Sequence, residues 1–273
     1  MKKYCDIKQR LLDIAKTEET IRAVIVIGSS VRTNILEDEY SDLDLVIVTD
    51  YVDEWLYGEK PEQLGKMKIS CVEPVLGGGK KRRISFDGYL DVDMVLFSTE
   101  QFLDVIENGI ASMVMGRGYQ VWYDVMDCTA LLSRSIVKEI QPAEFSEEEF
   151  CNMVNDFFFH TIWAEKKILR GELWSAKMCV DAYLKNCLLR IIEMYSHEKL
   201  GTDVWHNGRF LDNWAEEGIK EELRHCFAHY EKSDIEAALV STRTLFAGLA
   251  RETAKRKGYK YPLEAEKYAK NFV

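Results

Sequence analysis

A glycine and two serines follow the first strongly apolar segment of the chain. Residues 23–27 form an unbroken apolar run rich in β-branched side chains, and Gly28, Ser29 and Ser30 come directly after it. Glycine lets a phosphate approach the backbone closely, and serine hydroxyls and free N–H groups at the start of a short helix can donate to its oxygens. We predict that residues 28–30 bind the phosphates of a nucleotide. Arg32 could add a charge-assisted contact or lie at the surface.

A pair of carboxylates opens the next apolar run. Asp42 and Asp44 follow Ser41, and side chains two apart in a strand point to the same face. Adjacent carboxylates repel each other unless a cation lies between them. Magnesium binds through one or two carboxylates together with substrate phosphates. The spacing therefore predicts a magnesium–nucleotide site at Asp42 and Asp44, with Ser41 among the nucleotide-binding residues and Leu43 and Leu45 facing the core.

A third acidic segment lies at the start of a later apolar run. Asp91 and Asp93 again stand two apart, so both side chains point to one face of the expected strand. A third carboxylate is needed if two metal ions are to be held. We favour Asp93 because it enters the apolar run directly, and Asp91 is the alternative.

The elements that must position these residues follow from the spacing of apolar side chains. Up to about residue 140 the pattern mixes helix and strand, and beyond it the pattern is almost entirely helical. We expect a helix over 5–20 and strands at 23–27, 43–48, 67–73, 82–86 and 89–97. The predicted fold class is α+β, with a mixed β-sheet flanked by helices in an N-terminal domain, 1–142, and an all-α C-terminal domain, 143–273. Pro142 marks the boundary.

Two capping boxes are predicted in the helical half. Ser146 with Glu149 should open a helix that runs to about residue 170, and Ser233 with Glu236 should open another that runs to about 256. A further helix is expected from about 172 to 196.

Glycines and basic residues are concentrated at 77–83. The glycines favour a turn, and the basic run is expected to be a solvated hairpin tip. The alternative is that these cations screen the charge of a triphosphate.

The composition limits the classes of partner. The chain has 273 residues and a net charge of −10, which argues against broad nucleic-acid binding and favours a cationic small molecule. Its seven cysteines include no Cys-x-x-Cys pair, as expected for reduced thiols. No apolar run approaches the roughly 20 residues that span a bilayer. We predict a cytoplasmic protein without a membrane partner; its oligomeric state stays unknown.

Taken together, these residues resemble known enzymes. The Gly28-Ser29 turn, the Asp42/Asp44 pair and Asp93 are similar to the motif of the nucleotidyltransferase superfamily related to DNA polymerase β. The stretches 205–211 and 258–262 resemble the aminoglycoside 6-adenylyltransferase (streptomycin adenylyltransferase) family. The resemblance covers about residues 7–265. The chain departs from the family around 74–93.

The resemblance implies an enzyme that uses ATP and Mg²⁺ to transfer AMP to a hydroxyl of a cationic aminoglycoside. Streptomycin is the family's known acceptor, at its 6-position, and the biological role would be antibiotic resistance. The hydroxyl would attack the α-phosphorus of ATP and release pyrophosphate, with two metals roughly 3.5–4 Å apart at the three aspartates. Asp42 and Asp44 would bridge the metals, and Asp93 would hold the one that activates the hydroxyl.

The general base is less clearly marked. Lys177 and Asp181 lie four residues apart on an expected helix, so they share a face. Asp181 could be the base beside the acceptor hydroxyl with Lys177 near phosphate, or the two could form a structural ion pair. Other acids that could line an acceptor pocket cannot be ranked: Glu165, Glu172 and Asp203.

Two other functions stay open. One is a nucleotidyltransferase whose acceptor is a different small molecule or a protein hydroxyl. The other is a catalytically silent nucleotide-binding module, which three clustered carboxylates disfavour.

Overall fold

The computed structural model describes residues 2–32, 37–136, 145–201, 204 and 206–272. The chain divides into two compact units, Met1–Ile140 and Gln141–Val273, which we describe one at a time. The predicted boundary at 142/143 lies outside the described residues. No helix in the described ranges is both long enough and apolar enough to cross a bilayer.

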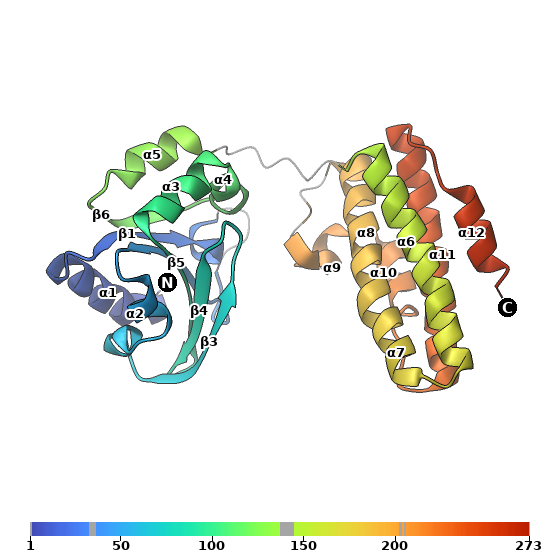
Figure 1. Cartoon of the computed structure of the whole chain (residues 1–273), viewed down its shortest axis with the longest axis horizontal. Coiled ribbons are helices and arrows are strands. Elements are labelled where there is room, and N and C mark those ends of the chain that lie inside the picture. Colours follow the sequence, from blue (N-terminus) through green and yellow to red (C-terminus); the bar gives the residue numbers. More distant parts are fainter. Residues whose placement is uncertain (1, 33–36, 137–144, 202–203, 205, 273) are drawn as a thin grey trace. The chain divides into compact units, whose positions relative to one another are not determined.

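The N-terminal unit is built on a mixed sheet (Figure 1). Its six described strands lie in the order β3-β4-β5-β2-β1-β6. Strands β2 and β5 pair in parallel, and the other neighbouring pairs of the described sheet are antiparallel. The strands are β1 (Ile21–Ile27), β2 (Leu43–Thr49), β3 (Met67–Pro74), β4 (Lys80–Phe86), β5 (Leu90–Phe97) and β6 (Gln120–Asp124).

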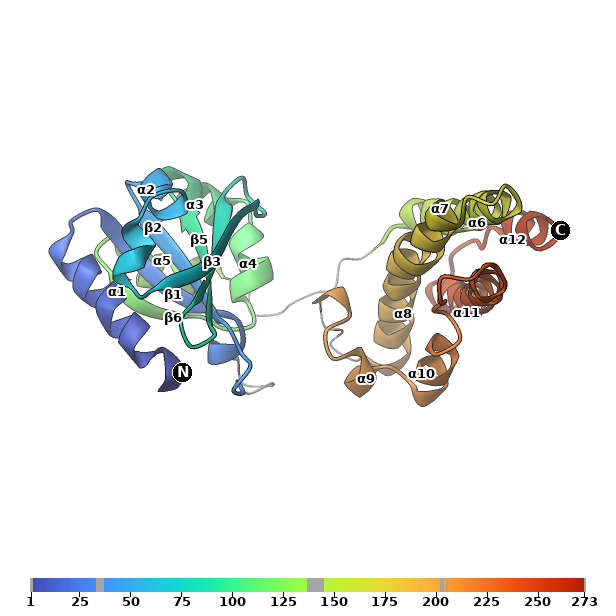
Figure 2. The same ribbon diagram turned by 90° about the horizontal axis from the view of Figure 1, so that it is seen from below.

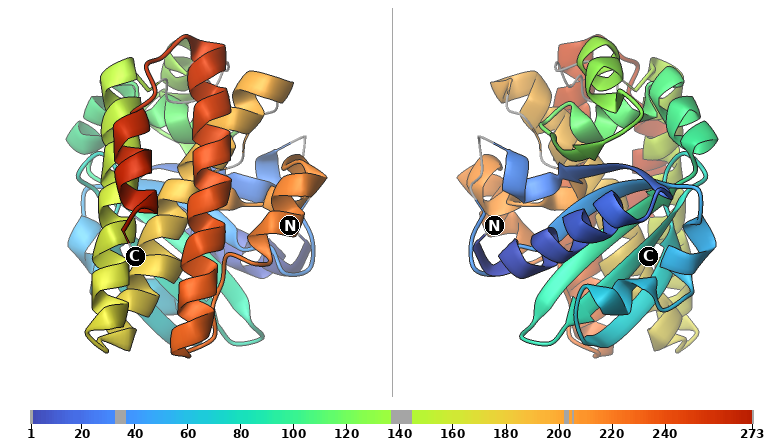
Figure 3. Two further views of the ribbon diagram at one scale, coloured as in Figure 1. Left: turned by 90° about the vertical axis from the view of Figure 1, so that its right-hand side faces the viewer. Right: turned by 90° about the vertical axis from the view of Figure 1, so that its left-hand side faces the viewer.

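Helices cover both faces of this sheet. One face packs against α1 (Cys5–Thr17) and α2 (Val52–Leu56); both are labelled in Figure 2, and α1, in dark blue, lies in front of the strands in the right-hand view of Figure 3. The other face packs against α3 (Thr99–Glu107), α4 (Ile110–Met115) and α5 (Cys128–Ser135). Strands β1 and β2 are therefore buried on both faces, which explains their unbroken apolar sequences. Short 3-10 turns complete the unit: η1 (Lys2–Tyr4), η2 (Gly28–Val31) and η3 (Lys60–Gln63).

The expectation of a solvated basic tip at 77–83 is wrong. Strand β4 begins at Lys80, so the basic residues alternate between the two faces of the sheet. Arg82 is 7% exposed and donates to the carbonyls of Trp55 and Gly58. Burial is tolerated because these acceptors satisfy the guanidinium, although desolvation lowers its pKa.

The C-terminal unit is a bundle of helices (Figure 3). Its core includes Phe157 and Phe246, whose rings stack with centroids 3.6 Å apart. The predicted capping box is confirmed: Ser146 and Glu149 bond reciprocally at the start of α6. The elements are α6 (Glu147–Leu169), α7 (Leu173–Met178), the π-helical turn η4 (Cys179–Tyr183), α8 (Leu184–Leu200), η5 (His206–Gly208), α9 (Leu211–Trp214), α10 (Glu217–Leu223), α11 (Lys232–Lys257) and α12 (Leu263–Lys270).

Two details of the helical half differ from prediction. The N-cap of α11 is Glu231, so Ser233 lies inside the first turn and forms no capping box. Asp234 instead accepts the backbone N–H of His229 at 2.6 Å, which closes the turn before the helix. The expected single helix at 172–196 contains the η4 π turn, which apolar spacing did not indicate.

Candidate metal and nucleotide site

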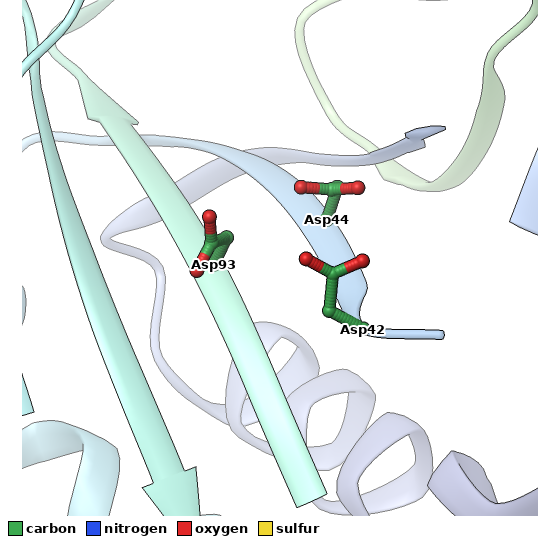
Figure 4. A group of neighbouring side chains, drawn as sticks. All are labelled: Asp42, Asp44 and Asp93. Atoms are coloured by element: carbon green, nitrogen blue, oxygen red, sulfur yellow. The ribbon is translucent and has the colours of Figure 1, made fainter. Parts of the chain in front are cut away.

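Three carboxylates meet on one face of the N-terminal sheet. Each of Asp42, Asp44 and Asp93 offers an oxygen, and these oxygens lie within 4.8 Å of one another (Figure 4). Asp44 and Asp93 are register partners in the parallel β2–β5 ladder, and Asp42 stands two residues before Asp44. The parallel pairing thus aligns acids that come from distant parts of the chain.

The acid from the 91–93 segment that joins this group is Asp93. Asp93 is 8% exposed, whereas Asp91 is exposed and lies outside the group. Leu43 and Leu45 are fully buried on the opposite face, as the alternation of the strand predicted. The geometry therefore places Asp42 and Asp44, the two predicted co-ligands, beside Asp93.

Gly28 is required by the approach of a carboxylate. Its φ is +78°, and a Cβ there would lie 2.0 Å from Asp44 Oδ2. The sequence had suggested that this glycine makes room for a phosphate; in the structure its missing side chain makes room for Asp44. Ser29 follows, and its Oγ is buried with no hydrogen-bond partner among the described residues. A buried polar atom without a partner calls for an explanation, and a bound ligand supplies one.

The other predicted nucleotide-binding residues lie around this turn. Ser30 and Arg32 are half-buried at and just after η2. The Ser41 hydroxyl donates to Asp38 Oδ1 at 3.0 Å and accepts the Asp38 N–H at 2.9 Å, so it shapes the turn that leads into β2. A nucleotide contact by Ser30, Arg32 or Ser41 stays a prediction.

Tyr4 ties together the two segments that carry the acids. Its Oη lies 3.0 Å from the carbonyl oxygens of both Ser41 and Asp91, and the side chain is buried. Burial, together with the negative charges of Asp42 and Asp91, raises the pKa of Tyr4 to about 12. Local sequence does not indicate this role, because the role depends on where η1 packs.

Two cations from β4, Lys81 and Arg83, also reach the acids, a contact that was not expected from the sequence. Lys81 Nζ lies 2.9 Å and Arg83 Nε 3.2 Å from Asp93 Oδ2. Arg83 is the register partner of Asp93, and Lys81 lies two residues away on the same face. The two-residue spacing of Lys81, Arg83, Asp91 and Asp93 was visible in the sequence, but the register that joins the strands was not.

The donor set suits a hard divalent cation. Three clustered carboxylates supply the oxygen ligands that Mg²⁺ prefers, and they leave coordination positions for phosphate and water. The glycine that admits Asp44 is consistent with a metal-bound phosphate, as is the Ser29 hydroxyl, which has no hydrogen-bond partner among the described residues. The residues present therefore fit a divalent cation that carries a phosphate group.

In the C-terminal unit, Lys177 and Asp181 form an ion pair across α7 and η4. Ala228 completes the contact: its carbonyl accepts from Lys177, and its N–H donates to Asp181 Oδ2 at 3.3 Å. Asp181 Oδ1 is buried and has no hydrogen-bond partner among the described residues. π-Helical turns are frequent at functional sites. The ion pair that was one of the two alternatives is present. A role of Asp181 as general base and of Lys177 near phosphate stays a prediction.

Two of the other acids predicted as possible members of an acceptor pocket lie close to cations in the structure. Glu165 is near Arg243 at 3.6 Å, and burial raises its pKa. Glu172 pairs with Lys167 at 2.6 Å. Asp203 lies outside the described residues.

Comparisons with known proteins identify relatives along the whole sequence. A family model described as streptomycin adenylyltransferase matches residues 1–273. An aminoglycoside 6-adenylyltransferase of Campylobacter jejuni is 25% identical over 285 residues, covering 96% of this chain and 92% of that protein. An aminoglycoside 6-adenylyltransferase of Bacillus subtilis (strain 168) is 22% identical over 265 residues, covering 92% and 90%.

Two solved structures are also similar. An aminoglycoside 6-adenyltransferase from Bacillus subtilis has a TM-score of 0.47 and 19% identity, covering 98% of this chain and 96% of its own. A nucleotidyltransferase-like protein from Exiguobacterium sibiricum has a TM-score of 0.42 and 11% identity, covering 92% and 78%. The family expected from residues 205–211 and 258–262 is confirmed by the family model. The chain therefore belongs to the streptomycin adenylyltransferase family and is a nucleotidyltransferase.

Proposed function

We propose that this protein transfers AMP from ATP to a hydroxyl of a cationic aminoglycoside of the streptomycin type, at its 6-position, and thereby confers resistance in the cytoplasm. The observation that carries the proposal is the meeting of Asp42, Asp44 and Asp93 beside the Gly28–Ser29 turn. Membership of the family and the names of its relatives support the reaction and the acceptor class.

The three aspartates would hold Mg²⁺, which when bound supplies charge stabilisation to the entering and leaving oxygens. The chain's own residues supply orientation. Ser29 and Ser30, with the backbone N–H groups of η2, would donate to the phosphate oxygens, and Arg32 and Ser41 would flank them. Residues 1–142 would then be the nucleotidyltransferase domain, and 143–273 the helical substrate-binding domain.

We assign Asp181 the role of general base, with Lys177 as the residue that orients it. The support is a carboxylate oxygen, Oδ1, that is buried and has no hydrogen-bond partner among the described residues, with the Lys185 ammonium at 4.0 Å as its ion-pair neighbour. Removing a proton from the acceptor hydroxyl needs such an available acceptor.

The acceptor is tested by pyrophosphate release from ATP and Mg²⁺ with a panel of aminoglycosides, followed by mass measurement of the product. Release with streptomycin and addition of one AMP support the proposal. Release only with another hydroxyl compound points to a different acceptor. No release with any acceptor indicates a silent nucleotide-binding module.

The metal ligands are tested by a matched pair on one strand. Asp93→Asn should abolish turnover, whereas Asp91→Asn, an exposed acid two residues away, should leave it nearly unchanged. Asp42→Asn should behave like Asp93→Asn while keeping the fold. Full turnover in Asp42→Asn would refute the metal role.

The base is tested by the pH dependence of kcat. Asp181→Asn should lower kcat and change the shape of the profile, because the proposed base is lost. Lys177→Met breaks the same ion pair but keeps the carboxylate, so its profile should keep the wild-type shape. Profiles that match wild type in both variants exclude the base role.

A further inference from the structure

A charge network crosses strands β3, β4 and β5 beside the acidic cluster. Lys81 Nζ lies 2.9 Å from Asp93 Oδ2 and 3.0 Å from Glu73 Oε1. Arg83 Nε lies 3.2 Å from each of the same two oxygens. Two cations thus stand between two carboxylates, one of which belongs to the acidic cluster and one of which does not.

The pairing register fixes this arrangement. Glu73 and Lys81 are partners in the β3–β4 ladder, and Arg83 and Asp93 are partners in the β4–β5 ladder. The Lys81 and Asp93 side chains are only 16% and 12% exposed, so their interaction is weakly screened. Arg83 is 51% exposed, and its charge is better screened by solvent. Lys81 is therefore the cation that matters most to Asp93.

This contact sets up a competition. An ammonium within hydrogen-bond distance of a carboxylate repels a second cation that approaches the same group. Glu73 offers Lys81 another acceptor at nearly the same distance, so the ammonium can keep a partner when Asp93 is taken by something else.

We propose that Lys81 is a positioning residue that neutralises Asp93 in the metal-free enzyme and transfers to Glu73 when a divalent cation occupies Asp93. The inference deepens the proposed function and rests on it, because it assumes a metal site at the three aspartates. It assigns Glu73, outside the acidic cluster, the role of accepting the displaced ammonium.

The test is calorimetric titration of the whole protein with Mn²⁺ alone, without nucleotide or acceptor. Lys81→Met should bind Mn²⁺ about tenfold more tightly, as expected when a like charge beside a ligand is removed. Glu73→Gln should bind it several-fold more weakly, and Lys81→Arg, which keeps the cation, should stay close to wild type. Lys80→Met is the matched control, because Lys80 contacts Tyr57 Oη at 2.7 Å and has no contact with Asp93 or Glu73 among those described.

A double-mutant cycle separates the transfer from a general charge effect. If Glu73 acts through Lys81, Glu73→Gln should have a clearly smaller effect on Mn²⁺ affinity in the Lys81→Met background than in wild type; the part that remains belongs to Arg83, whose Nε lies 3.2 Å from the same two carboxylate oxygens. Additive effects, or an affinity unchanged by Lys81→Met in a folded protein, would overturn the proposal. Thermal unfolding of each variant checks the fold. If Lys81→Met fails to fold, the conservative Lys81→Arg variant still decides the test. A large change in the Mn²⁺ affinity of Lys81→Arg overturns the proposal.

The result is independent of the acceptor. Loss of Mn²⁺ binding in Asp42→Asn with no response to Lys81→Met would overturn this inference and leave the proposed function standing. If the wild-type protein binds no Mn²⁺, with or without ATP, both this inference and the proposed function are wrong.

Discussion

The side chain that Gly28 lacks is the space that the Asp44 carboxylate occupies: a Cβ on Gly28 would lie 2.0 Å from Asp44 Oδ2. We expect Gly28→Ala to lower kcat/KM by at least about 100-fold, because an acid displaced by an ångström no longer serves the reaction. The positive φ of +78° adds a stability cost of about 1 kcal/mol. Steady-state kinetics and urea unfolding measure the two effects.

Gly109→Ala is the control for backbone strain. Gly109 has φ +74°, and a Cβ there would meet nothing within 4 Å. It should lose similar stability while keeping activity near wild type. An equal loss of activity in both variants would show that strain, and not the contact with Asp44, explains the glycine.

The Tyr4 hydroxyl, whose single proton is shared between the carbonyls of Ser41 and Asp91, can be removed without changing the ring. Tyr4→Phe should cost about 1 kcal/mol of unfolding free energy, the usual scale for hydrogen bonds lost from a folded protein. Because Ser41 and Asp91 adjoin the strands that carry the acids, Mn²⁺ affinity should also fall several-fold. Tyr89→Phe, at a position that is 91% exposed, should change neither quantity. A stable Tyr4→Phe protein with unaltered Mn²⁺ binding would exclude the positioning role.

Asp124 should make the stability of the protein depend on acidic pH. Burial opposes its ionisation, but bonds from the Thr129 hydroxyl and from the N–H groups of Thr129, Cys128 and Met126 outweigh it and lower the pKa to about 2. The folded protein releases this proton more readily than the unfolded chain, whose pKa is about 3.9. The stabilisation is therefore present above pH 4 and lost as the pH falls from about 4 to 2.

Asp124→Asn should reduce stability at pH 7 by about 1 kcal/mol, typical of a weakened helix cap, and should flatten the loss below pH 4. Asp127→Asn is the control, because the Asp127 side chain forms no capping bond to α5. Urea unfolding between pH 2 and 7 measures both. A wild-type acid dependence in Asp124→Asn would contradict the assignment.

Lys185 should make the stability of the protein depend on alkaline pH. Burial lowers its pKa to about 8, although its ammonium donates to the Val180 carbonyl and Thr242 Oγ1, each at 2.8 Å. Between pH 8 and about 10.4, the usual lysine value, the unfolded chain keeps a proton that the folded protein has released. Unfolding free energy should therefore rise with pH in that window, by at most about 1.4 kcal/mol per pH unit.

Lys185→Met removes the titrating group, so the difference in stability between wild type and variant should grow in favour of wild type from pH 8 to 10. Chemical unfolding at several pH values measures it. A constant difference across that range would show that Lys185 keeps an ordinary pKa.

Much of the fold was predictable because burial and helix capping require particular residue types at particular spacings in the local sequence. Strands β1 and β2 are covered on both faces, and their unbroken apolar sequences predicted this burial. Ser146 and Glu149 bond to each other across three residues, so their spacing alone identified the start of α6. The Asp42/Asp44 pair was likewise predictable, because side chains two residues apart in a strand point to the same face of the sheet.

The features that were not predicted depend on contacts between residues that lie far apart in the sequence. Lys81 and Arg83 looked like part of a charged turn, and only the β4–β5 register brings them to Asp93. Tyr4 acts through carbonyls at positions 41 and 91, a contact between three separate segments. Ser233 had the spacing of a cap, but the chain enters α11 at Glu231 because Asp234 is engaged with His229.

The parallel pairing of β2 with β5 has a consequence for how this protein can vary. Insertions in the loops between Thr49 and Leu90 that leave α2, β3 and β4 intact change neither strand, so these loops can lengthen while the acids stay aligned. A deletion of one residue inside β5 ahead of Asp93 would instead turn its carboxylate toward the apolar layer under α1 and α2. Tolerance to length changes should therefore switch abruptly at the strand ends, and a scan of single deletions would map that limit.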